Sequence, residues 1–345
     1  TFSFPFFKEM ENEAERFSQS DENAIVKDHI FTEDEIKREY KWATDQFKAP
    51  GISFSVYTPF GSIPDPDSAT QEDLKFSCCP STIIEITVEN NSDQEWELYF
   101  AHHGSTPWMP FMGSEGLKGA HTQGRMGFAS TDTDLFEFID FSVDKALSRE
   151  HTNAKFLLAP VAGLAAKVAP EERRTVRIAV GYFIGGDVTF NYITQYWYKR
   201  YFSSLSEVLS FSLANADKSL ELAAVRDNEL SESGLNSDQQ FLLAHATRSY
   251  YGSTQWLDNG RPVWVVNEGE YLMINTLDLT VDMLFFELRY NPWTVRNVLE
   301  HFATRYAYHD QIFSPDAPEY LHEGGLSFTH DMGVGNVFSP EKYSC

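Results

Sequence analysis

The sequence is poor in cysteine and in basic residues, and it lacks a long apolar run. Three cysteines occur in 345 residues, two of them adjacent at Cys78 and Cys79, so the pattern indicates idle thiols in a reducing compartment and no disulfide framework. The 27 basic residues face 51 acidic ones, and the net charge of −24 argues against nucleic acid or an anionic membrane as partner. No stretch approaches the roughly 20 apolar residues of a membrane span. Together these features predict a cytoplasmic protein.

Several cofactor motifs are also missing. The sequence has no Walker loop, no G-x-G-x-x-G after a predicted strand, no H-E-x-x-H and no C-x-x-C. We therefore predict neither a cofactor nor a bound metal ion.

The first part of the chain has the pattern of β structure. Ile84, Ile86 and Val88 alternate with polar residues, which is typical of a strand with one wet face. Similar alternation covers 52–57, 96–100 and 176–182, with turn-forming residues between the strands. Many strands with short polar turns predict an antiparallel β-sandwich over residues 1–203.

The spacing of apolar residues then changes to that of helices. We expect a linker helix over 204–233, a helix over 237–255 that starts with a capping box, and two more over 278–288 and 292–306. The predicted organisation is therefore an all-β domain, the linker helix, and a helical domain that begins at residue 234.

The segment 261–282 combines a buried-type run with acids. Val263–Val266 is followed directly by Asn267, Glu268, Gly269 and Glu270. Carboxylates beside a run that must be buried are costly unless they are hydrogen-bonded or used. Two acids this close are common where acid–base or nucleophilic chemistry is performed on a sugar. An exposed acidic turn that closes a buried strand explains the same residues.

Two further acidic groups are candidates. Asp278 and Asp282 lie one turn apart on a predicted helix, where an acid either binds sugar hydroxyls or simply stabilises the helix N-terminus. His330 and Asp331 form a donor–acceptor pair suited to neighbouring hydroxyls, with a helix cap as the alternative.

Aromatic and histidine residues complete the set of candidates. Trp264 and Tyr250 could supply a stacking platform for a pyranose, although core packing is the more frequent role of such residues. His102, His103 and Trp108 are expected in a loop after the 96–100 strand. That loop either closes a pocket or is simply solvated, and adjacent imidazoles on an extended segment point apart, which disfavours a metal site.

One long segment resembles a known family. VVNEGEYLMINTLDLTVDMLFFELRYNPWTVRNVL is similar to the nucleophile segment of glycoside hydrolase family 52, the retaining β-xylosidases. The likeness continues in GGLSFTHDMGVGNVFS, LLAHATRSYYGSTQ and KREYKWATDQFKAPGISFSVYTP. The resemblance implies a β-sandwich followed by the first helices of an (α/α)6 barrel, in a chain that is a central fragment of a longer enzyme.

The resemblance also implies roles for particular residues. It makes Glu268 the nucleophile, with Glu270 as its rival and Asn267 as a partner of the sugar 2-hydroxyl or of the nucleophile. Asp278 ends a pattern, E-Y-x-M-x-N-T-x-D, that a related β-glucosidase family shares. The acid–base aspartate is expected beyond the position matching Cys345, so residues 1–345 alone should show negligible turnover.

The implied substrate is a xylo-oligosaccharide, cleaved from its non-reducing end with retention. Two alternatives stay open: a glucose-specific enzyme with the same mechanism, and a catalytically silent carbohydrate-binding module. A homodimer is compatible with the resemblance.

Overall fold

The chain divides into two compact units, each assembled from segments that are separate in the sequence. A computed structural model describes residues 2–4, 29–113, 116–147 and 159–340. Unit 1 consists of Thr1–Phe60, Pro80–Phe183 and Ser204–Ala244, and unit 2 of Gly61–Cys79, Ile184–Ser203 and His245–Cys345. The predicted domain limits (1–203, 204–233 and 234–345) remain a prediction.

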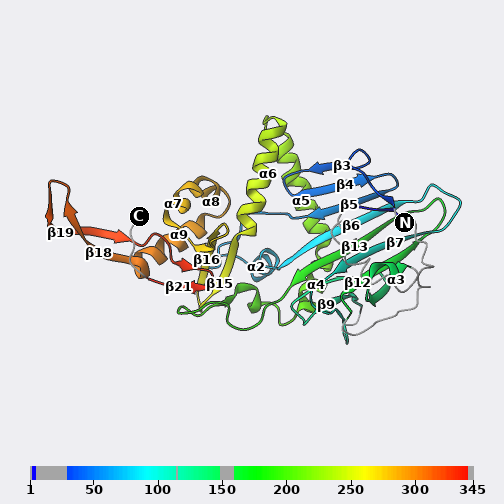
Figure 1. The fold of residues 1–345 in the computed structure, drawn as a ribbon, viewed down its shortest axis with the longest axis horizontal. Helices are drawn as coiled ribbons and strands as arrows, with labels where there is room; N and C mark the ends of the chain where they lie inside the picture. The colour runs from blue at the N-terminus through cyan, green and yellow to red at the C-terminus, as the bar shows by residue number, and fades with distance from the viewer. Residues whose placement is uncertain (1, 5–28, 114–115, 148–158, 341–345) are drawn as a thin grey trace. The chain divides into compact units, whose positions relative to one another are not determined.

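Unit 1 is built mainly from antiparallel sheets (Figure 1). The larger sheet has the order β3 (Lys37–Tyr40), β4 (Thr44–Ala49), β5 (Ile52–Tyr57), β6 (Ser81–Glu89), β13 (Arg173–Tyr182), β10 (Met126–Ser130), β9 (Lys118–Thr122), β8 (Met109–Pro110). The smaller sheet has the order β11 (Phe136–Asp140), β12 (Val161–Val168), β7 (Trp96–His103). Short strands β1 (Phe2–Ser3) and β2 (His29–Ile30) pair in parallel, and the helices are α3 (Val143–Leu147), α4 (Leu205–Ala214) and α5 (Ala216–Ser231).

Strand β6 shows how the alternating sequence produces the layers of unit 1. Ile84, Ile86 and Val88 are buried in an apolar cluster that also includes residues of the smaller sheet. Ile83, on the opposite face, packs with Leu209 of α4. Burying one such side chain contributes about 1.5–3 kcal/mol. The alternating residues of β6 therefore hold the smaller sheet on one face, and Ile83, which departs from the alternation, adds the contact with α4 on the other.

The predicted linker helix is two helices, because the chain breaks at Asn215. The Asn215 side chain donates to the Phe211 carbonyl at 2.9 Å, and its own backbone N–H donates to the same carbonyl at 3.1 Å. A side chain that bonds the preceding turn in this way competes with helix continuation. At the start of α4, Ser204 caps the helix by accepting from the Glu207 N–H.

Unit 2 combines short strands with helices. Its sheet has the order β14 (Gln195–Tyr196), β15 (Thr254–Asp258), β16 (Pro262–Glu268), β17 (Met273–Ile274), β20 (Gly333–Val334), β21 (Val337–Phe338). The helices are α2 (Gln71–Ser77), α7 (Leu277–Asp282), α8 (Leu284–Tyr290) and α9 (Pro292–His301), with a 3₁₀ turn at Trp197–Arg200 and a π turn at Phe302–Tyr306. Helix α6 (Ser237–Gly252) contains the boundary between the units.

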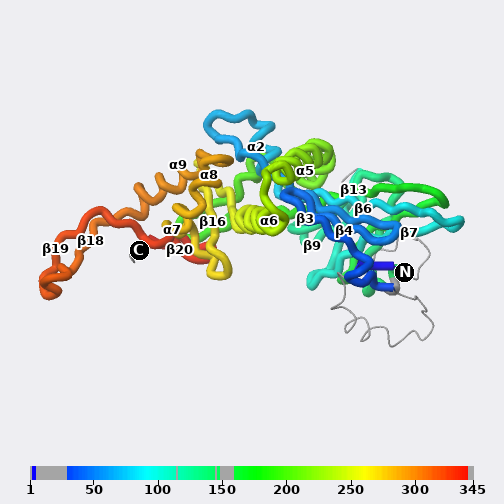
Figure 2. Tube along the Cα trace, turned by 90° about the horizontal axis from the view of Figure 1, so that it is seen from above, coloured from blue at the N-terminus to red at the C-terminus, as the bar shows by residue number. Residues whose placement is uncertain are grey.

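The prediction of an all-helical region after residue 234 is wrong, because strands alternate with the helices there. The β-branched residues of β16 pair with β15, and a long hairpin forms from β18 (Ala307–Ser314) and β19 (Ala317–Phe328). Figure 2 shows this hairpin extending away from α9. The helix predicted over 278–288 is also divided, at Met283 between α7 and α8.

The core of unit 2 is aromatic. The Trp264 ring packs edge-on against Trp256 and Trp293, with centroids 6.4 and 5.9 Å apart. Val263, Val265 and Met332 belong to the same buried cluster. Among the helices in the described ranges, none combines the length and the apolar character needed to cross a membrane.

Candidate active site

Strand β16 carries the principal candidate at its end. The run from Val263 to Val266 is at most 8% exposed, and Glu268, the last residue of the strand, is half-buried. Its partner across the ladder is Met273 of β17. A strand paired on both sides is a rigid support for a side chain at its end, so Glu268 is held by the fold and is not a free acid on an exposed turn.

The Glu268 carboxylate receives a hydrogen bond that sequence reasoning missed. The Thr276 hydroxyl donates to Glu268 Oε2 at 2.9 Å. Thr276 is only 3% exposed and directly precedes α7. Within the residues that the structure describes, Glu268 Oε1 accepts no hydrogen bond. The carboxylate is thus held through one oxygen while the other is available.

The two neighbours of Glu268 in the N-E-G-E motif lie in different environments. Glu270 is exposed in the turn between β16 and β17. Asn267 is 9% exposed, and successive strand residues point to opposite faces. Its Oδ1 is buried and has no hydrogen-bond partner among the described residues. Among the described residues Glu268 is bonded by Thr276 and not by Asn267, so of the two partners predicted for Asn267 only the sugar 2-hydroxyl remains. Glu270 is exposed and does not share a buried cavity with Glu268.

The segment His330–Asp331 lies against the chain that follows β17. The His330 carbonyl accepts from the Leu277 N–H at 2.9 Å, and the Met332 N–H donates to the Ile274 carbonyl at 2.8 Å. The predicted imidazole–carboxylate pair forms, with His330 Nδ1 and Asp331 Oδ2 3.0 Å apart. The fold therefore joins the His330 backbone to Leu277, the residue after Thr276, although the two are far apart in the sequence.

Asp331 is the more deeply buried member of this pair. Its side chain is 3% exposed, against 28% for His330, and its Oδ1 accepts from the Gly333 N–H at 2.8 Å. Gly333 has φ +134°, and a Cβ there would come within 2.0 Å of the Val337 carbonyl oxygen, so only glycine fits. Asp331 thus fixes the loop and the imidazole while His330 keeps the more accessible surface.

Asp278 and Asp282 are exposed on the short helix α7. Asp278 lies in the first turn, as predicted, and its Oδ1 accepts from the Leu279 N–H at 2.9 Å. An acid at this position stabilises the helix N-terminus. The same carboxylate is exposed enough to contact a ligand.

The two aromatic candidates have different surroundings. Trp264 is 2% exposed and belongs to the core, in agreement with its alternative interpretation. Tyr250 is half-buried, and its hydroxyl donates to Glu287 Oε1 at 2.6 Å. Neither ring offers an open stacking face in the way that Tyr271, at 73% exposure, does.

Glu287 of α8 is a buried acid that the sequence analysis missed. It is 1% exposed, and burial raises the pKa of its carboxyl, while the hydrogen bond from Tyr250 and the nearby Trp264 indole oppose that rise. The Trp264 Nε1 faces this group without the geometry of a full hydrogen bond. In the sequence, the only indication of a buried acid at this position is that Glu287 lies among the apolar residues of LFFELRY.

The expectation of a solvated loop at His102, His103 and Trp108 is wrong. Both histidines are the last residues of β7, because pairing of His102 with Ala162 and of His103 with Val161 extends the ladder. Trp108 is fully buried in the core of unit 1. Burial lowers the pKa of His102, with a smaller effect from His103.

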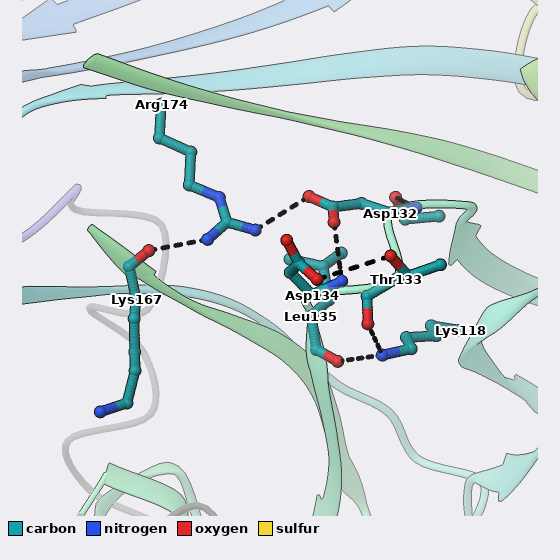
Figure 3. A network of polar contacts seen from close by, with 8 residues as sticks. Lys118, Asp132, Thr133, Asp134, Leu135, Lys167 and Arg174 are labelled. Atoms are coloured by element: carbon teal, nitrogen blue, oxygen red, sulfur yellow. Dashed lines mark hydrogen bonds and ion pairs between the residues drawn. The ribbon is translucent and has the colours of Figure 1, made fainter. Parts of the chain in front are cut away.

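A second polar cluster, in unit 1, lines a surface hollow (Figure 3). Lys118 Nζ donates to the carbonyls of Thr133 and Leu135, and Arg174 bridges the Lys167 carbonyl and Asp132. These bonds fasten the loop between β10 and β11. Lys118 and Arg174 therefore stabilise the fold of this loop. In the described part of the chain, no group of three or more His, Cys, Asp or Glu side chains is arranged to hold a metal ion.

Comparison with known proteins identifies relatives of the whole chain. The family model described as "Glycosyl hydrolase family 52" matches residues 1–345. A beta-xylosidase of Geobacillus stearothermophilus is 41% identical over 323 residues, which cover 91% of this chain and 45% of that protein. A second beta-xylosidase of the same organism is 36% identical over 366 residues, covering 99% of this chain and 58% of that protein. The chain thus spans about half the length of the curated relatives it matches.

Proposed function

Because the chain belongs to glycosyl hydrolase family 52, we propose that the protein containing it is a retaining exo-β-1,4-xylosidase that acts on xylo-oligosaccharides. Glu268 is the nucleophile of this proposal. The observation that carries it is the placement of Glu268 at the end of a buried strand, with Oε2 bonded to Thr276 and Oε1 available. The matched relatives bear the name beta-xylosidase, which supports the choice of sugar.

The chemistry proceeds in two displacements. Glu268 Oε1 attacks the anomeric carbon of the terminal xylose, forming an ester as the bond to the leaving-group oxygen breaks. A second carboxyl, typically 5–5.5 Å from the nucleophile, gives that oxygen a proton and later activates water. We assign this second role to none of the carboxyl groups of this chain.

The other candidate residues serve the sugar in this proposal. His330 and Asp278 would bind ring hydroxyls, with Asp331 fixing the His330 imidazole through the 3.0 Å contact. Asn267, Glu270, Trp264 and Tyr250 were also predicted to bind substrate. We propose that Asn267, Trp264 and Tyr250 support the site through their burial, and that Glu270, exposed in the turn after β16, takes no part in the chemical step.

The proposed architecture of the whole protein is a β-sandwich followed by an (α/α)6 barrel. The two facing sheets of unit 1 support the sandwich. Helices α6 to α9 would belong to the barrel together with further helices. The predicted cytoplasmic location and the homodimer remain predictions.

Mechanism-based labelling tests the nucleophile. A 2-fluoro-xyloside with a dinitrophenolate leaving group needs little acid assistance, so its reaction depends on the attacking carboxylate and not on the acid–base residue. We expect one xylosyl label on the peptide that contains Glu268, found by digestion and mass spectrometry. Glu268→Gln should remain unlabelled, while Glu270→Gln, which changes the exposed neighbour, should label normally.

The outcomes separate the three candidate functions. A label on Glu270 or elsewhere would overturn the assignment of Glu268. Labelling by the 2-fluoro-glucoside in preference to the xyloside would favour the glucose-specific alternative, whose substrate carries an additional hydroxymethyl arm. Binding of xylo-oligosaccharides without any label would indicate a silent binding module.

A further inference from the structure

Thr276 occupies a position where its hydroxyl would ordinarily cap a helix. It is the N-cap residue of α7, and a threonine at that position usually accepts from a backbone N–H of the first turn. Thr276 makes no such bond. Its hydroxyl donates to Glu268 Oε2 at 2.9 Å, so a group that normally stabilises a helix is directed to the candidate nucleophile.

Asn275 makes this placement of Thr276 geometrically accessible. Strand β17 ends at Ile274, and Asn275 then adopts a left-handed conformation with φ +49°. Asparagine tolerates this region better than most residues with a side chain. The turn at Asn275 leads the chain out of the sheet and places Thr276 beside the end of β16.

The Asn275 side chain replaces the strand contacts that are lost at this turn. Its Oδ1 accepts from the Val266 N–H at 2.7 Å, and its Nδ2 donates to the Trp264 carbonyl at 2.9 Å. Its own backbone N–H donates to the Val266 carbonyl at 2.9 Å. Because Asn275 is 2% exposed, these bonds satisfy polar groups that would be costly to leave unpaired.

The segment His330–Met332 bonds the residues on either side of Asn275 and Thr276. Leu277, next to Thr276, donates to the His330 carbonyl, and Ile274, next to Asn275, accepts from the Met332 N–H. Thr280 also donates through its hydroxyl to the Thr276 carbonyl at 3.0 Å. Thr276 therefore has little freedom to move away from Glu268.

We propose that Asn275 and Thr276 are the positioning residues of the Glu268 carboxylate. Asn275 locks the connection against β16, and Thr276 holds Oε2 so that Oε1 faces the anomeric carbon. The inference rests on the proposed function, because it assigns a purpose to the orientation of a nucleophile. In the covalent intermediate Oε1 carries the sugar and Oε2 becomes the ester carbonyl oxygen, which can keep the Thr276 hydroxyl as its donor.

The effect should appear in the chemical step and not in sugar binding. A misplacement of about 1 Å in a reacting group can cost on the order of 100-fold in rate. In the complete protein we expect Thr276→Val to slow labelling by the dinitrophenyl 2-fluoro-xyloside by roughly 10–100-fold. The reagent concentration that gives half-maximal rate should stay nearly constant, and Thr276→Ser, which restores the hydroxyl, should restore the rate.

Two further variants distinguish positioning from general damage to the fold. Thr294→Val removes another buried threonine hydroxyl of unit 2, which donates to the Asn291 carbonyl at 2.8 Å and does not bond Glu268. It should lower the melting temperature without slowing labelling. Asn275→Gly permits the left-handed backbone but removes the side-chain amide, and it should slow labelling as Thr276→Val does.

The results separate this inference from the proposed function. Wild-type protein labelled on Glu268, together with Thr276→Val labelled at the same rate, would overturn only the positioning role. A slow Thr276→Ser that matches Thr276→Val would do so as well. Wild-type protein that takes no label on Glu268 would overturn the proposed function and this inference with it.

Discussion

Both units bury polar side chains, but unit 2 buries more of them than unit 1, whose described residues include Thr44, Ser55, Asn90, Ser130, Asp140 and Ser212. The main core of unit 1 lies between two sheets and consists of apolar residues such as Ile178 and Phe128, while charged pairs such as Arg177 and Glu85 lie nearer the surface. The interior of unit 2 contains, beside its aromatic cluster, a set of buried polar side chains: Thr189, Thr194, Thr247, Asn267, Asn275, Thr276, Thr280, Glu287, Asn291, Thr294, Thr329 and Asp331.

The larger number of buried polar side chains makes the interior of unit 2 depend more on specific hydrogen bonds. Burial of a polar group is favourable only when a partner is fixed for it, so each one constrains the local structure more tightly than an apolar residue does. In unit 2, Asn275 bonds Val266 and Trp264 of β16, and Thr276 bonds Glu268 at its end. The apolar core between the sheets of unit 1 can tolerate changes among residues of similar volume. The surroundings of Glu268 depend instead on the particular donors and acceptors of Asn275 and Thr276.

The largest expected effect tests the apolar core of unit 1. Phe128 is 1% exposed, and its ring lies 5.2 Å from Phe100 and 5.3 Å from Trp108. Phe128→Ala should lower the free energy of unfolding by about 3–5 kcal/mol, measured by urea unfolding. The matched change Phe141→Ala, at a side chain that is 50% exposed, should cost less than about 0.5 kcal/mol. Equal losses from the two variants would contradict this description of the core.

The second prediction concerns the buried acid of unit 2. Burial raises the pKa of Glu287 above its usual 4.5, so the folded protein keeps a proton that the unfolded chain releases. Stability from this group is therefore full below pH 4.5 and is lost as pH rises toward the folded pKa. The slope is about 1.4 kcal/mol per pH unit while Glu287 alone differs between the two states.

Glu287→Gln should remove this contribution to the pH dependence, since an amide is neutral throughout. Urea unfolding of the wild type and the variant between pH 4 and 8 measures the difference. Glu270→Gln, at an exposed acid of the same unit, serves as the control and should leave the profile unchanged. A Glu287→Gln profile parallel to the wild type would show that the buried carboxyl keeps its ordinary pKa.

Much of unit 1 could be predicted because its contacts follow a local period. The alternation in β5 and β6 indicates both strands without knowledge of their partners, and in β6 it also indicates the buried face. In β5 the apolar residues are only partly buried, and Ser55 is the buried one. The error at His102 and His103 arose because pairing with β12 extends β7 by residues whose own pattern does not indicate a strand. Asn215 broke a predicted helix through a side-chain bond that periodicity does not reveal.

The candidate site was less accessible to sequence reasoning. The run before Glu268 indicates a buried strand that ends in an acid, and the adjacent His330 and Asp331 indicate a pair. The role of Thr276 could not be found in this way, because it depends on the left-handed turn at Asn275 and on a hydroxyl that leaves its usual capping position. Glu287 was hidden for a related reason: its partner Tyr250 lies 37 residues earlier in the chain.

The smallest expected effect sharpens the comparison, because an acid of unit 1 should respond to pH in the opposite direction. Lys37 and Lys48 hold the pKa of Glu39 down to about 2. Stability from these two ion pairs is therefore present above pH 4.5 and is lost as pH falls toward 2. These side chains are partly exposed, so Glu39→Gln should cost at most about 1 kcal/mol at pH 7. The cost should shrink in 0.5 M salt, to about 0.5 kcal/mol or less, and a salt-independent loss in urea unfolding would show that Glu39 acts through packing instead.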